Sequence, residues 1–490
     1  MEEYDRRRIY LEKGAHIAFM AVAMWIGGAV LFRMFFELKG TFAPDAAIFL
    51  AVGRGILNGL TPYTDLFETK PPGIFFLSAL SLWWNDGLGI AKIFQAIAIG
   101  GIPVGMIFMV EKQKILAFIF GGLLALYVAE YAGEMIPESF GAFLAVVFLA
   151  VIARQKRLRW KGMLFSSFLL LAAISMKEPF ILSIAAGVLV LNKEQEQSLN
   201  QKFLISLGLA TVMGVFLLFL TGYMKAFFFD YLPHMFFHVR QYDNMVWPAL
   251  PVRAFFVHKT FWHLWSFSWP FTIVILSLWA WQVHRPLQWL AVTYLTMLAI
   301  AMGGDFYPHH FVFAAPLYAA LFVSFIEHHT SSFIRIFVMV MLLLGIPSYP
   351  ARQYHQRVLE WQEREPPLQE AAVIVDRVLD QCGYDRYINL TNKGQSVFGY
   401  TKHSPAGPLF AQYSRFIDGN DRYFEEFARN IQRDTHVMVV TDFLDDGFIS
   451  GDGKKGILTL FGPDPPPCAK NFEQPDAVTV LFRKKVSGST

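Results

Sequence analysis

A charged stretch, TFAPDAAIFLAVGRGILNGLTPYTDLFETKPPG (residues 41–73), separates the first hydrophobic segment of the chain from the second. It contains three acidic side chains, Asp45, Asp65 and Glu68, and two basic ones, Arg54 and Lys70. Charged groups close to a bilayer are costly, and proteins that keep them there generally use them for function. We therefore interpret residues 41–73 as an active-site loop.

The composition predicts a polytopic α-helical membrane protein. Of the 490 residues, 54% are hydrophobic, 49 are phenylalanine and only 17% are charged, which is far more apolar than a soluble domain of average usage. The net charge of +3 says little about partners, because the distribution of Lys and Arg over the loops carries the information in such a protein. We expect membrane lipids around the chain and no nucleic-acid partner.

The hydrophobic segments predict about eleven membrane crossings by their length. The predicted spans are residues 14–32, 93–110, 115–129, 139–153, 162–176, 179–192, 203–224, 264–282, 286–304, 311–326 and 336–349. A further apolar segment, residues 71–85, is too short to cross alone, and we expect it to be partial or re-entrant. Residues 225–263 mix aromatic with charged side chains and are typical of interfacial helices.

Basic residues set the expected orientation. Arg6, Arg7, Arg8 and Lys13 precede the first span, and the loop over residues 154–161 is the most basic in the chain. Because Lys and Arg concentrate on the cytoplasmic side, both the N-terminus and this loop are predicted to be cytoplasmic. The same topology places residues 41–73 and the polar ends of several later spans on the outer side. Those ends include Glu138, Lys177, His309 and His310.

Residues 351–490 are polar and are predicted to form a separate extracytoplasmic α/β domain, distinct from a transmembrane domain over residues 1–350. The predicted elements are helices over residues 368–381 and 422–433, and strands over residues 387–390, 437–443 and 477–483. Pro366 and Pro367 mark the expected start of the first helix. Both cysteines, Cys382 and Cys468, lie here, and their pattern is compatible with a disulfide or with free thiols.

Several motifs resemble the membrane-embedded GT-C glycosyltransferases, specifically their bacterial protein-mannosyltransferase-like and aminoarabinose-transferase-like group. The similarity extends over roughly residues 10–350 and rests on short motifs. These are Pro44-Asp45, Gly53-Arg54 to Gly59, Pro62-Tyr63-Thr64-Asp65, Lys70-Pro71-Pro72-Gly73, Glu138, Lys177 in Met-Lys-Glu-Pro, and Phe306 to Phe311 with Pro316 behind it. Two positions depart from the family pattern: Ala46 follows Asp45 where an acidic pair is frequent, and His310 stands where a tyrosine is usual.

The resemblance implies transfer of a sugar, with inversion, from a polyprenyl-phosphate donor to a lipid, glycan or protein acceptor at the outer face of a bacterial inner membrane. An attacking hydroxyl must lose a proton, and Asp45 is the candidate catalytic base. The departing phosphate needs positive charge. Candidate phosphate ligands are Arg54, Lys70, Lys177, His309 and His310, and candidate substrate contacts are Tyr63, Asp65, Glu68 and Glu138.

Other function classes stay open at this point. A transporter or flippase for an anionic lipid-linked sugar would be expected to show two related halves with broken helices at mid-membrane, and no internal repeat is evident in the sequence. A non-catalytic scaffold would not require Asp45. No cofactor is expected. A divalent metal is compatible with the sequence but is not favoured, because Ala46 follows Asp45 and leaves a single acid there. The sequence identifies neither the sugar nor the acceptor.

Overall fold

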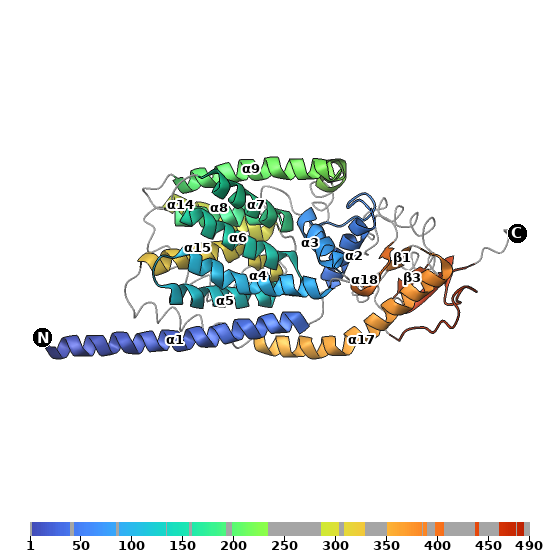
Figure 1. Cartoon of the computed structure of the whole chain (residues 1–490), viewed down its shortest axis with the longest axis horizontal. Coiled ribbons are helices and arrows are strands. Elements are labelled where there is room, and N and C mark those ends of the chain that lie inside the picture. Colours follow the sequence, from blue (N-terminus) through green and yellow to red (C-terminus); the bar gives the residue numbers. More distant parts are fainter. Residues whose placement is uncertain are drawn as a thin grey trace. The chain divides into compact units, whose positions relative to one another are not determined.

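The computed structural model describes residues 2–39, 44–84, 88–133, 135–155, 159–192, 198–233, 286–302, 308–328, 350–384, 386–389, 397–405, 437–440, 460–476 and 478–484. Its internal packing divides the chain into two compact units. Unit 1 consists of Met1–Lys39, Lys92–Phe216 and Val246–His355, and unit 2 consists of Gly40–Ala91, Leu217–Met245 and Gln356–Thr490. Figure 1 labels the helices and strands of both units.

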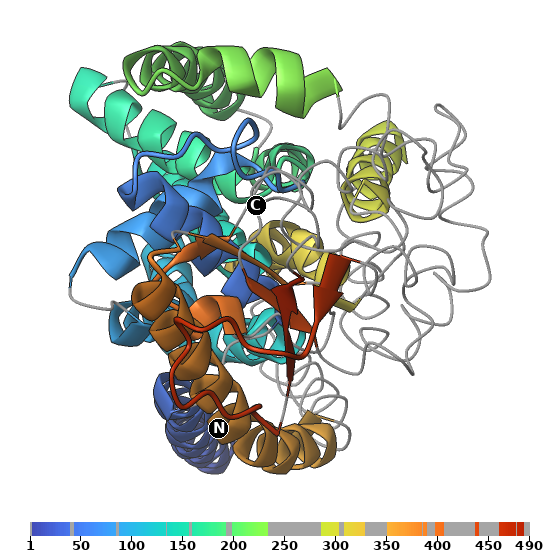
Figure 2. The same ribbon diagram turned by 90° about the vertical axis from the view of Figure 1, so that its right-hand side faces the viewer.

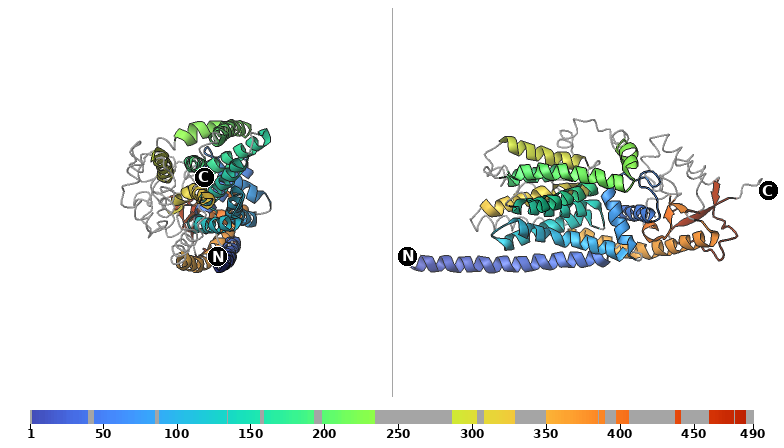
Figure 3. Two further views of the ribbon diagram at one scale, coloured as in Figure 1. Left: turned by 90° about the vertical axis from the view of Figure 1, so that its left-hand side faces the viewer. Right: turned by 45° about the horizontal axis from the view of Figure 1, so that its top comes forward.

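Unit 1 is a bundle of helices that run along a common direction (Figures 1 and 3). Its described elements are α1 (Glu2–Lys39), α4 (Leu88–Met109), α5 (Lys114–Ala132), α6 (Pro137–Arg154), α7 (Trp160–Met176), α8 (Phe180–Leu191), α9 (Ser198–Leu220), α14 (Pro286–Ala301), the 3-10 helix η4 (Pro308–Ala314) and α15 (Ala315–His328). Helix α4 begins in unit 2 and α9 ends there. The helices extend beyond most of the predicted spans because flanking polar residues continue them.

Helix α15 lies at the centre of unit 1, where it packs against α5, α6 and α8. The rings of Phe120 and Phe322 stack with centroids 4.6 Å apart, and Phe180 meets Phe313 edge to face at 5.1 Å. Helices α1 and α9 instead expose large apolar side chains, such as Phe32 at 65%. Lipid is the solvent in which such exposure carries no hydrophobic cost.

The described part of the chain confirms a multi-pass helical membrane protein. Six helices are long and apolar enough to cross a bilayer: His16–Lys39, Gly89–Met109, Lys114–Ala132, Pro137–Arg154, Leu199–Leu220 and His309–Glu327. Four shorter apolar helices accompany them, over Pro72–Trp83, Trp160–Met176, Phe180–Leu191 and Leu287–Ile300. The predicted spans over residues 264–282 and 336–349, and the surface segment from residue 234 to 263, lie outside the described residues.

Unit 2 begins with a helix where the sequence suggested a loop. Helix α2 (Pro44–Leu57) occupies the first half of residues 41–73, so the interpretation of that whole stretch as a loop was wrong. The apolar run from Ala46 to Val52 is buried. Pro44 occupies the first helical position, and Asp45 in the first turn is favourable to the helix dipole. Packing and helix-end chemistry thus outweigh the charged residues that suggested a loop.

Helix α3 (Pro72–Trp83) is as short as predicted. Its 12 residues span about 18 Å at 1.5 Å per residue, well below the roughly 30 Å of a hydrocarbon core. Helices α2 and α3 pack closely through Gly53, where an added Cβ would lie 2.6 Å from the Ala79 backbone nitrogen and 2.7 Å from Ser78 Cβ. A glycine is therefore required for the two backbones to approach at this point.

We expect Gly53→Ala to destabilise the protein by about 1–3 kcal/mol, because the new methyl group collides with backbone atoms and forces the two helices apart. Gly208 in α9 has nothing within 4 Å of an added Cβ, so Gly208→Ala is the matched control and should be neutral or slightly stabilising. Thermal unfolding of both variants in the same detergent measures the difference. Equal melting temperatures would show that the helices separate without cost.

The rest of unit 2 contains a five-stranded mixed sheet in the order β2-β1-β3-β5-β4 (Figure 2). Its strands are β1 (Arg386–Asn389), β2 (Ser404–Pro405), β3 (Val437–Val440), β4 (Phe461–Gly462) and β5 (Thr479–Arg483). Strand β1 pairs in parallel with β2 and β3, whereas β5 pairs antiparallel with β3 and β4. The predicted α/β character of the C-terminal region and three predicted strands are confirmed, with β1, β3 and β5 within a residue or two of the expected starts.

The structure shows where the proline pair of this region lies and whether its two cysteines are bonded. Helix α17 (Pro350–Cys382) contains Pro366 and Pro367 in its interior, so the prediction that they begin a helix was wrong. The prolines remove two backbone donors, and Figure 1 shows the change of direction along α17 that such a pair is expected to cause. Cys382 and Cys468 form a disulfide. The sequence was compatible with either a disulfide or free thiols. The predicted helix over residues 422–433 lies outside the described residues.

Unit 2 also holds α18 (Val397–Tyr400) and the π-helix η1 (Ala226–Tyr231). Helix α18 packs against α2, and an added Cβ at Gly399 would lie 3.5 Å from Ala47 Cβ, an ordinary van der Waals distance. Part of the stretch over residues 41–73 and part of the C-terminal region therefore pack together within one unit. A separate domain over residues 351–490 stays a prediction.

Candidate functional site

The candidate base Asp45 lies in the first turn of α2 and is exposed. The side chains that follow it, Ala46 to Val52, are fully or almost fully buried. The carboxylate is thus held at the end of a rigid, well-packed helix and faces solvent. The position suits a general base, because an accessible carboxylate on a fixed support can reach an incoming hydroxyl.

Arg54, at the other end of α2, is engaged by the C-terminal region of the same unit. Its guanidinium donates hydrogen bonds to the carbonyl oxygens of Phe398 at 2.9 Å and Gly399 at 3.4 Å. Nearby, Asn58 donates to Ser404 Oγ at 2.9 Å. Burial lowers the pKa of Arg54 from its ordinary value. These contacts fasten α2 to α18, and a phosphate contact for Arg54 stays a prediction.

We expect Arg54→Met to loosen this attachment by about 1.5–3 kcal/mol, the usual contribution of hydrogen bonds from a charged group. Hydrogen–deuterium exchange should then become faster in peptides that cover residues 397–405. Arg54→Lys keeps the charge but cannot reproduce the two-pronged donation, so its effect should be intermediate. Exchange rates that match the wild type in both variants would contradict the anchoring role.

The segment from Thr61 to Lys70 is a compact turn built by its own side chains. Asp65 Oδ2 accepts a hydrogen bond from the Thr61 backbone N–H at 2.7 Å, so its carboxylate stabilises the turn. Tyr63 has a left-handed φ of 70° and donates its hydroxyl to the Lys70 carbonyl at 2.9 Å. A non-glycine residue at positive φ in a turn is strained and is most frequent where function requires it.

Lys70 is held beside a buried carboxylate. Its ammonium lies 3.2 Å from Glu68 Oε1, and the Glu68 side chain is fully buried while that of Lys70 is 18% exposed. The ammonium also lies 5.7 Å from the centroid of the Phe49 ring, within the range of a cation–π contact. The turn therefore fixes one cation near the start of α3, with Tyr63 and Glu68 as its immediate supports.

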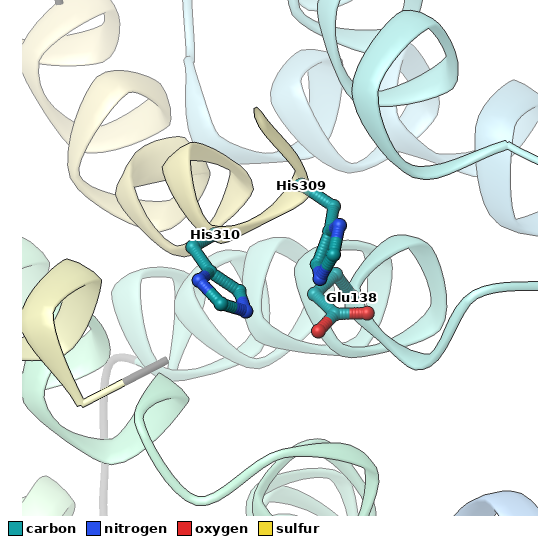
Figure 4. Close-up of side chains that lie close together, drawn as sticks. All are labelled: Glu138, His309 and His310. Carbon is teal, nitrogen blue, oxygen red and sulfur yellow. The ribbon is translucent and has the colours of Figure 1, made fainter. Parts of the chain in front are cut away.

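Unit 1 brings four predicted site residues together. Glu138 lies in the first turn of α6, Lys177 directly follows α7, and His309 and His310 are adjacent in η4. Lys177 Nζ lies 3.4 Å from Glu138 Oε1. One ligand atom from each of Glu138, His309 and His310 lies within 4.8 Å of the others, and Figure 4 shows both imidazole rings directed towards the carboxylate. Residues 138, 177 and 309–310 are far apart in sequence, so the fold creates this cluster.

Three polar residues that the sequence analysis did not single out support the cluster. Ser139 Oγ donates to Gln95 Oε1 at 2.9 Å, which ties the start of α6 to α4. The hydroxyl of Tyr127 donates to the Phe311 carbonyl at 3.1 Å and fixes η4 against α5. Gln95 within a mostly apolar segment was the available signal, since polar groups in membrane spans generally have a partner. Nothing in the sequence marked Tyr127.

The structure places predicted residues in two local groupings, where the sequence analysis expected one site. Glu68 and Lys70 pair with Tyr63 in unit 2, whereas Glu138, Lys177, His309 and His310 converge in unit 1. A single pocket shared by the two groupings stays a prediction.

No protein-family profile and no curated protein sequence matches the chain. Among solved structures, the chain is similar to the crystal structure of ArnT from Cupriavidus metallidurans bound to undecaprenyl phosphate. The TM-score is 0.51 at 11% sequence identity, and the match covers 96% of this chain and 98% of ArnT. The chain therefore has the GT-C fold of ArnT, as its motifs predicted.

Proposed function

We propose that the protein is a GT-C glycosyltransferase that moves a sugar from a polyprenyl-phosphate donor to a hydroxyl group. The observation that carries the proposal is the fold it shares, over 96% of the chain, with an ArnT structure that holds undecaprenyl phosphate. Cation-bearing clusters at Lys70 and at Lys177 add support, because a transferase of this class must stabilise a departing phosphate.

In the proposed reaction, the acceptor oxygen attacks the anomeric carbon of the sugar as Asp45 removes its proton. The bond between the anomeric carbon and the phosphate oxygen breaks on the opposite side, so the configuration inverts and polyprenyl phosphate leaves. Lys70 and Lys177 are the proposed partners of the phosphate as its negative charge grows. Tyr63, Asp65 and Glu68 are assigned to the support of Lys70, and Glu138 to that of Lys177, on the strength of their contacts.

The acceptor is proposed to be a lipid, glycan or protein hydroxyl on the outer face of a bacterial inner membrane. The disulfide between Cys382 and Cys468 supports an extracytoplasmic C-terminal region, because such bonds persist in oxidising compartments. The basic N-terminal residues support a cytoplasmic N-terminus.

The test is incubation of the purified protein, in liposomes, with a panel of labelled polyprenyl-phosphate sugars and candidate acceptors. Release of polyprenyl phosphate together with a glycosylated acceptor is the expected result. A flippase would instead move the intact donor between leaflets without cleaving it. Cleavage of no donor in the panel, combined with such movement, would contradict the transferase assignment.

A further inference from the structure

We propose that Glu138, His309 and His310 bind a divalent transition-metal ion of the zinc class. The three side chains supply a carboxylate and two imidazoles, and their ligand atoms lie within 4.8 Å of one another. Imidazole and carboxylate are the donors that zinc and neighbouring first-row metals prefer. The proposal goes beyond the glycosyl transfer described above and does not require it.

The geometry needs only a small contraction to become a metal site. Ligand atoms of a tetrahedral zinc site lie about 3.3 Å apart, given metal–ligand bonds of about 2.0–2.1 Å. Closing the present spacing to that value requires rotations of side chains and no change of fold. In Figure 4 the two rings approach the carboxylate from η4 while Glu138 extends from α6, so an ion between them would join the two helices.

The surroundings hold two of the ligands firmly. Glu138 is 1% exposed and His310 is 3% exposed, so both side chains are shielded from bulk water. The His310 ring stacks on Phe313 with an angle of 12° between the planes, and the hydrogen bond from Tyr127 to the Phe311 carbonyl fixes the backbone next to it. Such preorganisation lowers the cost of collecting the ligands around an ion.

The positive charge of Lys177 contributes to the net charge of the proposed metal site. Its ammonium lies 3.4 Å from Glu138 Oε1, longer than the roughly 2.7–2.9 Å of a direct charge-assisted hydrogen bond. A carboxylate has two oxygens with about four lone-pair sites, so Glu138 can pair with Lys177 and bind an ion as well. With two neutral imidazoles, one carboxylate, one ammonium and one divalent ion, the cluster would carry a net charge of about +2, which suits an anionic ligand at the remaining coordination position.

An oxygen of the donor phosphate has the right chemistry for that position. This last step rests on the proposed function, whereas the metal site itself does not. The assays below measure metal binding without any donor or acceptor, so a failure of the metal proposal can be told apart from a failure of the transferase proposal.

The experiment uses tag-free, full-length protein that has been stripped with a chelator and then titrated with Zn²⁺. Bound zinc is counted by inductively coupled plasma mass spectrometry. Glu138→Gln, His309→Gln and His310→Gln each remove one ligand, while Glu111→Gln and His16→Gln are matched controls at exposed positions. Cu²⁺ serves as a spectroscopic probe of the wild-type protein, because its paramagnetic resonance spectrum reports coordinated imidazole nitrogens and needs no variant.

We expect one zinc ion per wild-type chain, at least about tenfold weaker binding in each ligand variant, and unchanged binding in the controls. Lys177→Met should bind zinc at least about threefold more tightly, because a positive charge near the ion is removed. The Cu²⁺ spectrum should show two imidazole nitrogens. No stoichiometric zinc in the wild type, equal binding in every variant, or binding by Lys177→Met alone would each overturn the proposal.

Discussion

Replacing Asp45 with asparagine is expected to lower the turnover of the polyprenyl-phosphate sugar by about 10²–10⁴-fold, the usual contribution of a general base. Asparagine has the size of aspartate but cannot accept the proton of the attacking hydroxyl. The measurement is the rate of polyprenyl phosphate release under saturating donor and acceptor. Because Asp45 is exposed at the end of a well-packed helix, the variant should fold normally and still bind the donor.

Asp464 provides the matched control for this prediction. It is an exposed aspartate in the C-terminal region, and Asp464→Asn should leave turnover unchanged. Donor affinity of both variants, measured in parallel, separates a lost base from a lost binding contact. Wild-type turnover in Asp45→Asn would mean that another group takes the proton or that the protein is not a transferase.

The second large effect is expected at Lys70. Lys70→Met should reduce donor turnover by about 10²–10³-fold, comparable to the loss of one preorganised donor that stabilises a transition-state anion. Lys70→Arg keeps a cation and should retain far more activity. The same assay of polyprenyl phosphate release measures both variants.

Lys70→Met can also lower activity by destabilising the protein, because the fully buried carboxylate of Glu68 lies 3.2 Å from the Lys70 ammonium. Removing the lysine alone disturbs a buried ion pair, which can cost several kcal/mol of stability. The double variant Glu68→Gln with Lys70→Met removes both charges and avoids that penalty. If the double variant recovers turnover, the role of Lys70 is to neutralise Glu68, and the phosphate assignment is wrong.

The membrane class and the GT-C fold were predictable because their signals lie in short stretches of sequence. A span requires an apolar run of known length, and that pattern needs no tertiary information. Glu138, Lys177, His309 and His310 were each visible as charged or polar groups at the ends of such runs. Placing those ends on one side of the membrane predicted a single site that also included Asp45 and Lys70, and that larger site stays a prediction.

Other features depended on contacts that no local pattern encodes. Helix α2 was mistaken for a loop because its charged residues lie between two hydrophobic segments, whereas burial against α3 and α18 stabilises a helix there. The hydrogen bonds from Arg54 reach residues 398 and 399, which lie 344 and 345 positions further along the chain. A sequence pattern does not predict contacts between residues so far apart. The prolines within α17 were likewise taken as a boundary, although a helix can continue through proline with a kink.

The central claim is that the donor phosphate is bound by Lys70. An experimental structure with a bound polyprenyl-phosphate sugar tests it through the distance from Lys70 Nζ to the phosphate oxygens. We predict that the ammonium group lies within about 3.5 Å of one of those oxygens, or within reach through one shared water. A phosphate more than about 10 Å from Lys70 Nζ, beyond the Debye length at 0.1 M salt, would contradict the account.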